Sequence, residues 1–179
     1  MRVDAKTMLA DAGLASAAVS GSSDPVMNRL DCFERGGGLG ETRVSEESTL
    51  TQLLKESPFQ QLFDLSCTRL ERTAGEVEIA MRYTASVERS PGTRQYHGGA
   101  IASLIDIAGD YALWAVLGYG VPTINIRIDY LRPASDTNLR AQARVRRAGR
   151  TVGVVDIDVL DDEGRLVAIG RGTYGTKEG

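Results

Sequence analysis

The sequence predicts an α+β fold in which one long apolar helix is wrapped by one β-sheet. Residues 96–117, YHGGAIASLIDIAGDYALWAVL, are apolar on nearly every side of a helix, so such a helix needs cover all round its circumference. The segments before and after it alternate between apolar and polar residues, which is typical of strands. Since one sheet can bury one helix of this kind, a single arrangement explains both observations.

Composition limits the possible functions. The chain has 179 residues, 42% of them hydrophobic, which suits one globular domain with a substantial core. Its formal net charge of -3 gives no electrostatic reason to expect nucleic-acid binding. No apolar run reaches the roughly 18 to 20 residues of a membrane span, and the N-terminal stretch has only a weak hydrophobic region for export. We therefore expect no membrane contact and a cytoplasmic location.

Cysteine and histidine are scarce. The two cysteines, Cys32 and Cys67, lie far apart in the sequence, which argues against a disulfide framework and suits a reducing compartment. With His97 as the single histidine, a zinc site is not expected. We therefore predict neither a metal nor a redox cofactor.

The chain divides into two parts. Residues 1–47 contain few aromatics and are broken by Gly-, Ser- and Pro-containing stretches, so they are predicted to be an N-terminal extension, poorly ordered or loosely helical. Residues 48–179 are predicted to form the folded domain. It begins with a short amphipathic helix that has Ser48 as its N-cap and ends at Ser57 and Pro58.

The remaining elements follow from periodicity and turn residues. Two strands are predicted before the central helix, at residues 62–72 and 75–83, joined by a hairpin-like turn. The helix should stop at Gly118, because glycine readily ends a helix. Three or four more strands follow it, at residues 122–131, 137–148, 151–160 and 166–176.

The start of the central helix and a carboxylate within it form the candidate site. Gly98 and Gly99 have no side chain, so a ligand can approach their backbone, and first-turn amides lack partners within a helix. Such a helix end attracts anions and developing negative charge. Asp106 lies further along among apolar residues, where an ionised carboxylate is costly unless it is paired or used. A donor for an oxyanion and a carboxylate are the two halves of an acyl-transfer site.

Within one chain these two halves are too far apart to share a substrate. Eight residues separate Gly98 from Asp106, which corresponds to about 12 Å along a helix. One reacting carbonyl would therefore need the amide of one subunit and the carboxylate of another, and a two-fold dimer provides that arrangement twice. We therefore predict a homodimer with shared sites.

A purely structural interpretation is the alternative for each of these residues. Asp106 would then be satisfied by a neighbouring strand, and His97 would be an N-terminal cap. The fixed distance between the His-Gly-Gly start and the carboxylate favours function. Ser103, Asp106 and Asp110 form a polar stripe at i, i+3 and i+7. Within it Asp110 is interpreted as a solvated or interface residue rather than a catalytic one.

The segments HGGAIASLID (97–106) and NIRIDYLRPA (125–134) resemble the hotdog-fold acyl-CoA thioesterases. The similar branch is that of the phenylacetate-pathway and 4-hydroxybenzoyl-CoA enzymes, and the resemblance covers roughly residues 57–176. It implies an antiparallel sheet of about five or six strands around the long helix. It also implies dimers joined through their sheets, tetramers made from two dimers, and an acyl-CoA substrate.

The resemblance also implies roles for individual residues. Gly98 would supply the backbone amide that polarises the thioester carbonyl, and the partner subunit's Asp106 would be nucleophile or general base. His97 would order the helix start, and Thr123 would position the attacking water. Gly99 would lie against the substrate.

The loop before the histidine departs from the family pattern. Many relatives carry Asn or Gln six residues before the histidine, where this chain has Pro91. Gln95 is the only amide side chain near that position, so it is the candidate replacement.

Coenzyme A carries phosphates, which favour basic residues at the rim of the site. Arg132 and Arg150 are the predicted substrate-binding residues among five candidates. The other three are Arg94, Arg146 and Arg147. The alternative for the arginine-rich hairpin is a solvated turn. The acyl pocket would use apolar side chains of the helix, whereas Tyr111 and Trp114 suit the pocket and the core equally well.

The predicted function is hydrolysis of an acyl-CoA thioester to a free carboxylic acid and coenzyme A. Coenzyme A is part of the substrate, so no cofactor is expected. One alternative is a non-catalytic acyl-CoA-binding or sensor protein with the same fold. A hydratase or dehydratase ranks lowest, because His97 lies at the helix start rather than facing Asp106. The sequence leaves the preferred acyl group open.

Overall fold

The computed structural model describes residues 45–177. The predicted N-terminal extension, residues 1–47, lies outside this range except for its last three residues. In chain order the described elements are α2 (Glu46–Glu56), η1 (Gln60–Leu62), β1 (Asp64–Glu71), β2 (Glu76–Arg82), η2 (Ala85–Val87), α3 (Gly98–Leu117), β3 (Thr123–Tyr130), β4 (Leu139–Ala148), β5 (Val152–Asp161) and β6 (Leu166–Gly175).

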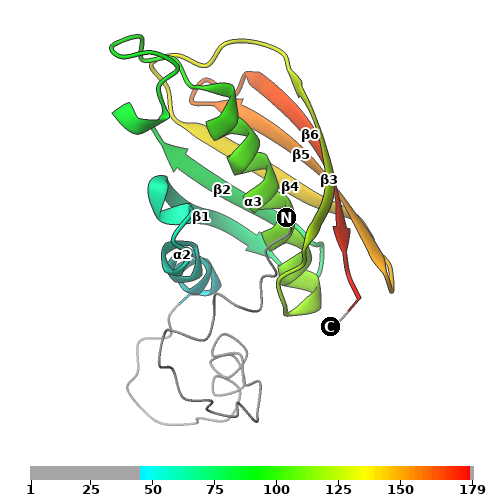
Figure 1. Ribbon diagram of the computed structural model, residues 1–179. Coiled ribbons are helices and arrows are strands. Elements are labelled where there is room, and N and C mark those ends of the chain that lie inside the picture. Colours follow the sequence, from blue (N-terminus) through cyan, green and yellow to red (C-terminus); the bar gives the residue numbers. More distant parts are fainter. Residues whose placement is uncertain (1–44, 178–179) are drawn as a thin grey trace, which may run out of the picture. The chain divides into compact units, whose positions relative to one another are not determined.

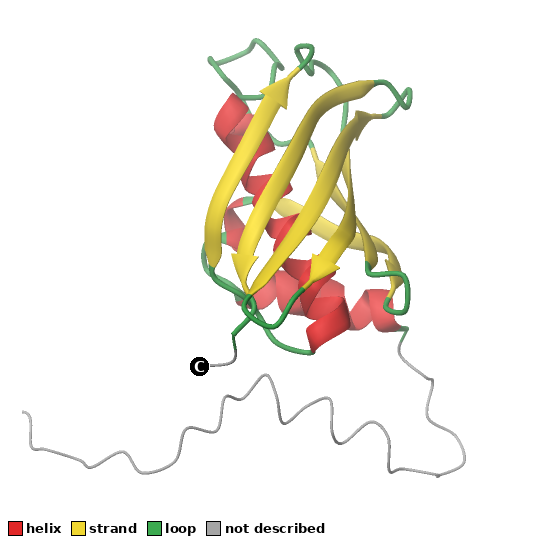
Figure 2. Ribbon diagram, turned by 90° about the vertical axis from the view of Figure 1, so that its right-hand side faces the viewer, coloured by secondary structure: helices red, strands yellow, loops and turns green. Residues whose placement is uncertain are grey.

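The strands form one six-stranded sheet in the order β1-β2-β4-β5-β6-β3. Every neighbouring pair is antiparallel. The long helix α3 lies across one face of this sheet (Figure 1), and the strands curve around it (Figure 2). The predicted hotdog arrangement is therefore confirmed, and each predicted strand is present with its ends shifted by at most a few residues.

The core is built on α3. The helix is buried along most of its length, and the facing side of the sheet supplies alternate buried residues such as Val77, Ile79 and Met81 of β2. By length and hydropathy alone α3 would suffice to cross a membrane, so the prediction that no segment reaches this length is wrong. In the folded chain 67% of its most apolar window is buried inside the protein, as expected for a core helix.

Close contact between α3 and the sheet depends on glycine. Tyr174 of β6 is fully buried, and its ring lies against Gly109 of α3 and against Gly172 of its own strand. A Cβ atom at Gly109 would lie 2.8 Å from Tyr174 Cζ, which is closer than carbon atoms pack. The Tyr174 hydroxyl donates a hydrogen bond of 3.3 Å to the carbonyl oxygen of Asp106. This contact fixes the rotation of α3 about its own axis.

The two edges of the sheet differ. Strand β1 is packed against α2, it contains a bulge between Cys67 and Arg69, and the Cys67 amide donates to the Thr51 hydroxyl of α2 at 2.9 Å. Strand β3 forms the other edge, and none of its residues is buried. A helix, a bulge and a side-chain hydrogen bond thus protect one edge, whereas β3 leaves its backbone groups open to pairing.

Helix α2 begins earlier than predicted. Its N-cap is Ser45, whose hydroxyl oxygen accepts a hydrogen bond of 3.2 Å from the Ser48 amide. The predicted cap, Ser48, therefore lies inside the first turn. Glu46 and Glu47 also lie in that turn, where acidic side chains interact favourably with the helix N-terminus. The end of the helix at Ser57 is as predicted.

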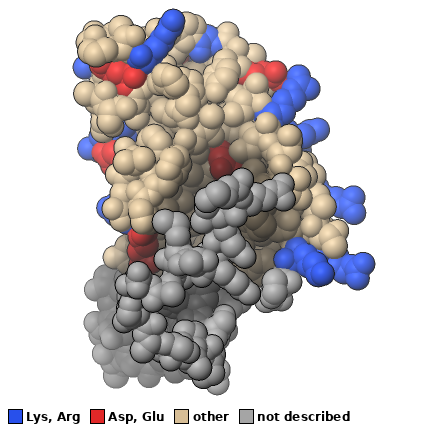
Figure 3. Space-filling view, viewed as in Figure 1, with Lys and Arg blue, Asp and Glu red and all other residues tan. Residues whose placement is uncertain are grey.

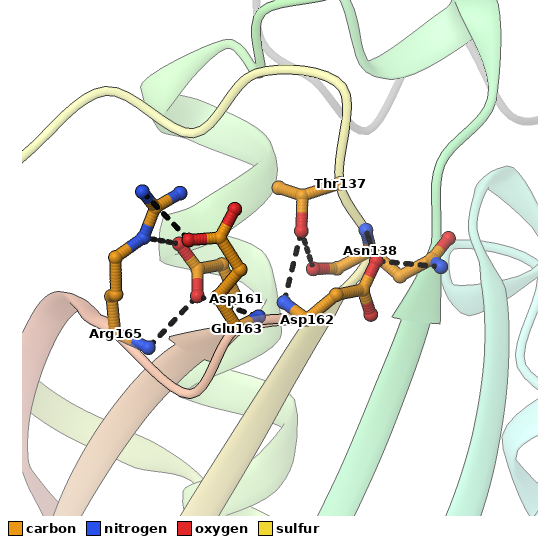
Figure 4. A network of polar contacts seen from close by, with 6 residues as sticks. All are labelled: Thr137, Asn138, Asp161, Asp162, Glu163 and Arg165. Carbon is orange, nitrogen blue, oxygen red and sulfur yellow. Dashed lines mark hydrogen bonds and ion pairs between the residues drawn. The ribbon is translucent and has the colours of Figure 1, made fainter.

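The turn between β5 and β6 anchors the connection from β3 to β4 (Figure 4). Asp162 of this turn accepts a hydrogen bond of 2.8 Å from the Asn138 amide, and its own amide donates to the Thr137 hydroxyl at 3.0 Å. The buried Asp161 carboxylate accepts from the Arg165 amide at 2.8 Å and from its guanidinium at 2.7 Å. The far end of residues 131–138 is thereby fixed to the sheet.

We predict that Gly109→Ala destabilises the domain, because the added methyl group has no space beside the fully buried Tyr174 ring. Overpacking of this kind costs about 1 to 3 kcal/mol in free energy of unfolding. Urea unfolding of the variant measures it. The matched control is Gly120→Ala, where a Cβ atom meets nothing within 4 Å. Equal stability of the two variants would contradict the packing argument.

Candidate active site

The start of α3 presents one amide that residues 45–177 leave unused. His97 is the N-cap, and its Nδ1 accepts a hydrogen bond of 2.9 Å from the Gly99 amide, while the His97 amide donates to the Val87 carbonyl at 2.8 Å. The Gly98 amide donates to no acceptor within the described part of the chain. It is therefore available to a ligand carrying negative charge. The capping role that the structural alternative gave to His97 is present in the fold.

Asp106 and Thr123 lie together in one chain. The Thr123 hydroxyl, at the first residue of β3, donates to Asp106 Oδ1 at 2.8 Å. Asp106 is half-buried rather than enclosed, so the prediction of a carboxylate surrounded by apolar side chains is wrong. Its position on the open side of α3 leaves the carboxylate accessible. The face of the protein that carries α3 is hollowed near its centre, and acidic atoms are visible there (Figure 3).

The edge strand β3 touches both halves of the candidate site. At its beginning Thr123 contacts Asp106, and at its end the Tyr130 hydroxyl donates to the Gly98 carbonyl at 2.9 Å. Tyr130 belongs to the NIRIDYLRPA segment, but sequence reasoning assigned it no role. Its spacing of seven residues from Thr123 would put the two side chains on opposite faces of a regular strand, and only the irregularity between Thr123 and Asn125 brings both to α3.

A pocket of about 450 Å³ opens beside the helix start. Four predicted site residues line it: Gln95, His97, Gly98 and Arg132. Ile101, Tyr130 and Leu131 add apolar surface. Asp106, Thr123, Gly99 and Arg150 do not line it. A single chain therefore brings the donor and a binding pocket together but keeps the carboxylate outside, as the separation along the helix predicts.

The loop before His97 is organised by a carboxylate rather than by an amide side chain. Glu88 accepts hydrogen bonds from the Gly92 amide at 2.6 Å, from the Arg94 amide at 3.2 Å and from the Tyr83 hydroxyl. Gln95 lines the pocket, and its backbone pairs with Ser135. The loop that contains Pro91 is thus held in place without the asparagine that many relatives carry there.

The candidate arginines fall into different places. Arg94 pairs with Asp136, and Arg146 pairs with Asp156 at 2.6 Å, so both guanidinium groups are already engaged. Arg132 lines the pocket. Arg89 lines it too, and sequence reasoning missed this residue although it belongs to the loop before His97. In the described part of the chain neither of these two forms an ion pair. Two uncompensated positive charges therefore flank the helix start.

Arg150 and the two helix aromatics lie elsewhere. Arg150 is in the β4–β5 hairpin, whose Gly153 approaches Leu113, so it is near the C-terminal half of α3. Tyr111 and Trp114 are buried, and the Arg72 guanidinium lies 4.8 Å from the centre of the Trp114 ring. These aromatics belong to the core and do not line the pocket.

A larger depression of about 640 Å³ lies on the sheet face opposite α3. Its charged side chains neutralise one another, for example Arg69 with Glu76 at 3.1 Å and Arg144 with Glu76 at 3.4 Å. It contains none of the predicted site residues. Among residues 45–177 no group of His, Cys, Asp or Glu is arranged to hold a metal ion.

Comparison with known proteins agrees with this geometry. The family model of the thioesterase superfamily matches residues 96–168, which include the helix start, Asp106 and Thr123. A putative esterase of Halobacterium salinarum is 39% identical over 111 residues, which are 56% of this chain and 73% of that protein. The chain belongs to the thioesterase superfamily.

Two superfamily relatives from Escherichia coli K12 have more specific names. The medium/long-chain acyl-CoA thioesterase YigI is 30% identical over 132 residues, covering 65% of this chain and 84% of YigI. The acyl-coenzyme A thioesterase PaaI is 37% identical over 91 residues, or 50% of this chain and 64% of PaaI. The solved PaaI structure superimposes with a TM-score of 0.63 at 26% identity, covering 72% and 89% of the two chains. The resemblance to the PaaI-like branch is confirmed.

Asp110 lies one turn after Asp106, and its protonation differs from that of an ordinary aspartate. Burial raises the pKa of Asp110 to about 6. The hydrogen bond from the Val121 amide, at 3.0 Å, acts against this shift, and the negative charge of Asp106 adds to it. The folded chain therefore keeps a proton on Asp110 at a pH where the unfolded chain has released it.

We predict that Asp110→Asn changes how stability depends on pH. Because the pKa of Asp110 is raised in the folded state, the contribution of Asp110 to wild-type stability falls as pH rises from about 4 through 6. Asparagine does not titrate, so the variant should gain about 1 to 3 kcal/mol relative to wild type over that window. Urea unfolding at pH 4 and pH 7.5 measures the difference. A stability difference independent of pH would contradict the assignment.

Proposed function

We propose that this protein hydrolyses acyl-CoA thioesters, with each active site shared between two copies of the chain. One observation carries the proposal: Gly98, whose amide is free in the described part of the chain, and Asp106 are bound to opposite ends of the open edge strand β3. The Gly98 carbonyl accepts a hydrogen bond from Tyr130, and the Asp106 carboxylate accepts one from Thr123. The names of the relatives PaaI and YigI support an acyl-CoA substrate.

The edge strand gives the proposed dimer its geometry. Ile124, Ile126 and Ile128 of β3 are all exposed or only half-buried, and Ile124 is 60% exposed. If two β3 strands pair antiparallel across a two-fold axis, the beginning of one lies beside the end of the other. The partner's Asp106 then approaches the Gly98 amide, which the separation of about 12 Å along the helix prevents within one chain. Dimers of this kind would assemble in pairs, as is common in the family.

The proposed chemistry uses groups of the protein alone. The thioester carbonyl oxygen accepts a hydrogen bond from the Gly98 amide, which stabilises negative charge as the carbonyl is attacked. The partner's Asp106 removes a proton from water, held by the Thr123 hydroxyl, or attacks the carbonyl carbon itself. Collapse of the tetrahedral intermediate breaks the carbon–sulfur bond, and coenzyme A leaves as the thiol after taking a proton from the protonated Asp106 or from water. Where Asp106 attacks directly, water then hydrolyses the acyl-aspartyl anhydride, which releases the carboxylic acid and restores the carboxylate. No metal or redox cofactor takes part.

The charges around the pocket suit coenzyme A. Arg89 and Arg132 line the pocket at the helix start and form no ion pair with any residue of 45–177, so they can pair with phosphate oxygens, for which guanidinium groups are well shaped. Arg150 lies away from this pocket in its own chain, so it would reach the nucleotide only from the partner subunit. Ile101, Tyr130 and Leu131 offer apolar contact to the remainder of the ligand.

Two other functions are weaker. A non-catalytic acyl-CoA-binding protein would keep the pocket and its arginines, and it is separated from the enzyme by whether thiol is released. A hydratase would need an imidazole free to act with the carboxylate. His97 Nδ1 is instead occupied by the Gly99 amide at the helix start.

We predict that Asp106→Asn and Gly98→Pro each abolish most thioester hydrolysis. Proline at Gly98 removes the amide hydrogen and should leave the helix start in place, since it is favoured at a first helical position and His97 is already extended, with φ -68° and ψ 138°. Losses of about 100-fold or more in kcat are expected for either change. Thiol release from acyl-CoA substrates of short, long and aromatic acyl groups measures them.

The matched control is Gly98→Ala, which keeps the amide and places its methyl group 3.4 Å from Tyr130 Cζ, an ordinary contact. It should retain activity within a few-fold of wild type. Unchanged turnover in a folded Asp106→Asn variant would refute the proposed mechanism. Tight acyl-CoA binding without thiol release by the wild-type protein would favour the binding function instead.

We further predict that the two inactive variants complement each other. A mixed dimer of Asp106→Asn and Gly98→Pro chains contains one site in which both the amide and the carboxylate are intact. Random pairing should restore up to about a quarter of wild-type activity. Co-expression with different affinity tags isolates the mixed dimer for assay. No recovery in an isolated mixed dimer would show that the site is not shared.

A further inference from the structure

Asp110 is the one carboxylate of the polar stripe on α3 that the proposed chemistry does not use. It follows Asp106 by four residues, so the two carboxylates lie on the same side of the helix about one turn apart. It is half-buried, and within residues 45–177 it forms no ion pair. The described titratable groups that interact with it are Asp106, Tyr111 and Tyr174, none of which is a cation.

Its contact is with the backbone that leads into β3. Asp110 Oδ1 accepts a hydrogen bond of 3.0 Å from the Val121 amide. Val121 lies two residues before Thr123, and Thr123 donates to Asp106 Oδ1 at 2.8 Å. Two carboxylates on successive turns of α3 therefore hold two successive points at the beginning of β3.

The beginning of β3 has weak support from the sheet itself. Helix α3 ends at Gly118 with φ 85°, and Gly120 is exposed, with nothing within 4 Å of the position that a Cβ atom would occupy, so the connection is intrinsically adaptable. Pro122 has no amide hydrogen to donate to the ladder, and the pairing of β3 with β6 is irregular between Thr123 and Asn125. The Pro122 carbonyl accepts from the Gly175 amide at 2.8 Å, which holds the side of the strand that faces β6. The hydrogen bond that the Val121 amide donates to Asp110 holds the side that faces α3.

We propose that Asp110 is a positioning residue, which fixes Val121 so that the Thr123 hydroxyl stays on the Asp106 carboxylate. This inference rests on the proposed function, because it assigns Asp110 a part in orienting the general base and the attacking water. Asp110 touches neither substrate nor water in this scheme. A misplacement of about 1 Å at such a distance from the chemistry is enough to lower turnover by roughly 100-fold.

Stability alone does not account for Asp110. Its charge is disfavoured by burial, and the neighbouring charge of Asp106 disfavours it further. Above about pH 6 the ionised carboxylate therefore supports the folded state less than the protonated side chain does, as described for the Asp110→Asn variant. A side chain that is costly to ionise while it holds the backbone beside a catalytic pair is consistent with the known opposition between stability and activity at functional sites.

The experiment compares Asp110→Ala, Asp110→Asn and Thr123→Val with the double variant Asp110→Ala/Thr123→Val. Asp110→Ala removes the acceptor, so kcat should fall roughly 10- to 100-fold while KM changes less than about three-fold. Asp110→Asn keeps an acceptor oxygen for the Val121 amide, so at pH 8 its kcat should stay within about three-fold of wild type. Because Asp110 acts through Thr123, the double variant should be no more than about three-fold slower than Thr123→Val alone.

The matched control is Asp158→Ala, an exposed aspartate on the sheet face opposite α3, whose kcat should equal that of wild type. Wild-type kcat in Asp110→Ala would overturn the inference. The inference would also be overturned if the loss of kcat in the double variant equalled the product of the losses in Asp110→Ala and Thr123→Val, since the two residues would then act independently.

A measurement that does not use activity separates this inference from the proposed function. Hydrogen exchange of the Val121 amide should accelerate at least about ten-fold in Asp110→Ala and stay unchanged in Asp158→Ala. If the wild-type protein releases no thiol, the proposed function fails, whereas the exchange result still decides whether Asp110 holds the strand. Unchanged exchange in Asp110→Ala would overturn the inference whatever the turnover.

Discussion

The close packing of α3 against the sheet is the constraint on which the rest of the structure depends. A helix that is apolar on nearly every side has no stable position in water, and the curved sheet removes most of it from solvent. The buried Tyr174 ring lies against Gly109 and bonds to the Asp106 carbonyl, so the helix has one rotation about its axis. That rotation places the polar stripe on the single side that the sheet leaves open.

The order of the elements could be read from the sequence because each rests on local chemistry. The alternation of apolar and polar residues predicted the buried face of β2, and the apolar composition predicted α3. The turns and the helix end fall at Gly75, Gly118 and Gly164, which all have positive φ in the structure. The start of α2 was misplaced because Ser45 and Ser48 are both suitable caps three residues apart. Local sequence does not distinguish them.

The site was predictable only in part, for a physical reason. The helix start and Asp106 lie in one continuous motif, so their types and spacing were visible. The bond from Tyr130 to Gly98, the bond from Val121 to Asp110 and the place of Arg89 in the pocket depend on how β3 and the loops return to α3. The two hydrogen bonds join residues that are 32 and 11 positions apart in the sequence, and the periodicity of a helix or strand carries no information about such contacts. Burial of Asp106 was overestimated because the open side of the helix is decided by the sheet.

The difference between the two edges of the sheet limits how far the protein can grow by strand pairing. β1 is covered by α2, and the Thr51 hydroxyl accepts from one of its edge amides, so within residues 45–177 only β3 leaves a sheet edge on which another strand can pair. If two copies pair through their β3 strands, the open sheet edge of each copy is occupied. Such a dimer would have closed two-fold symmetry and no unpaired sheet edge. Helix α2, by covering β1, would therefore prevent the growth of fibres by strand pairing.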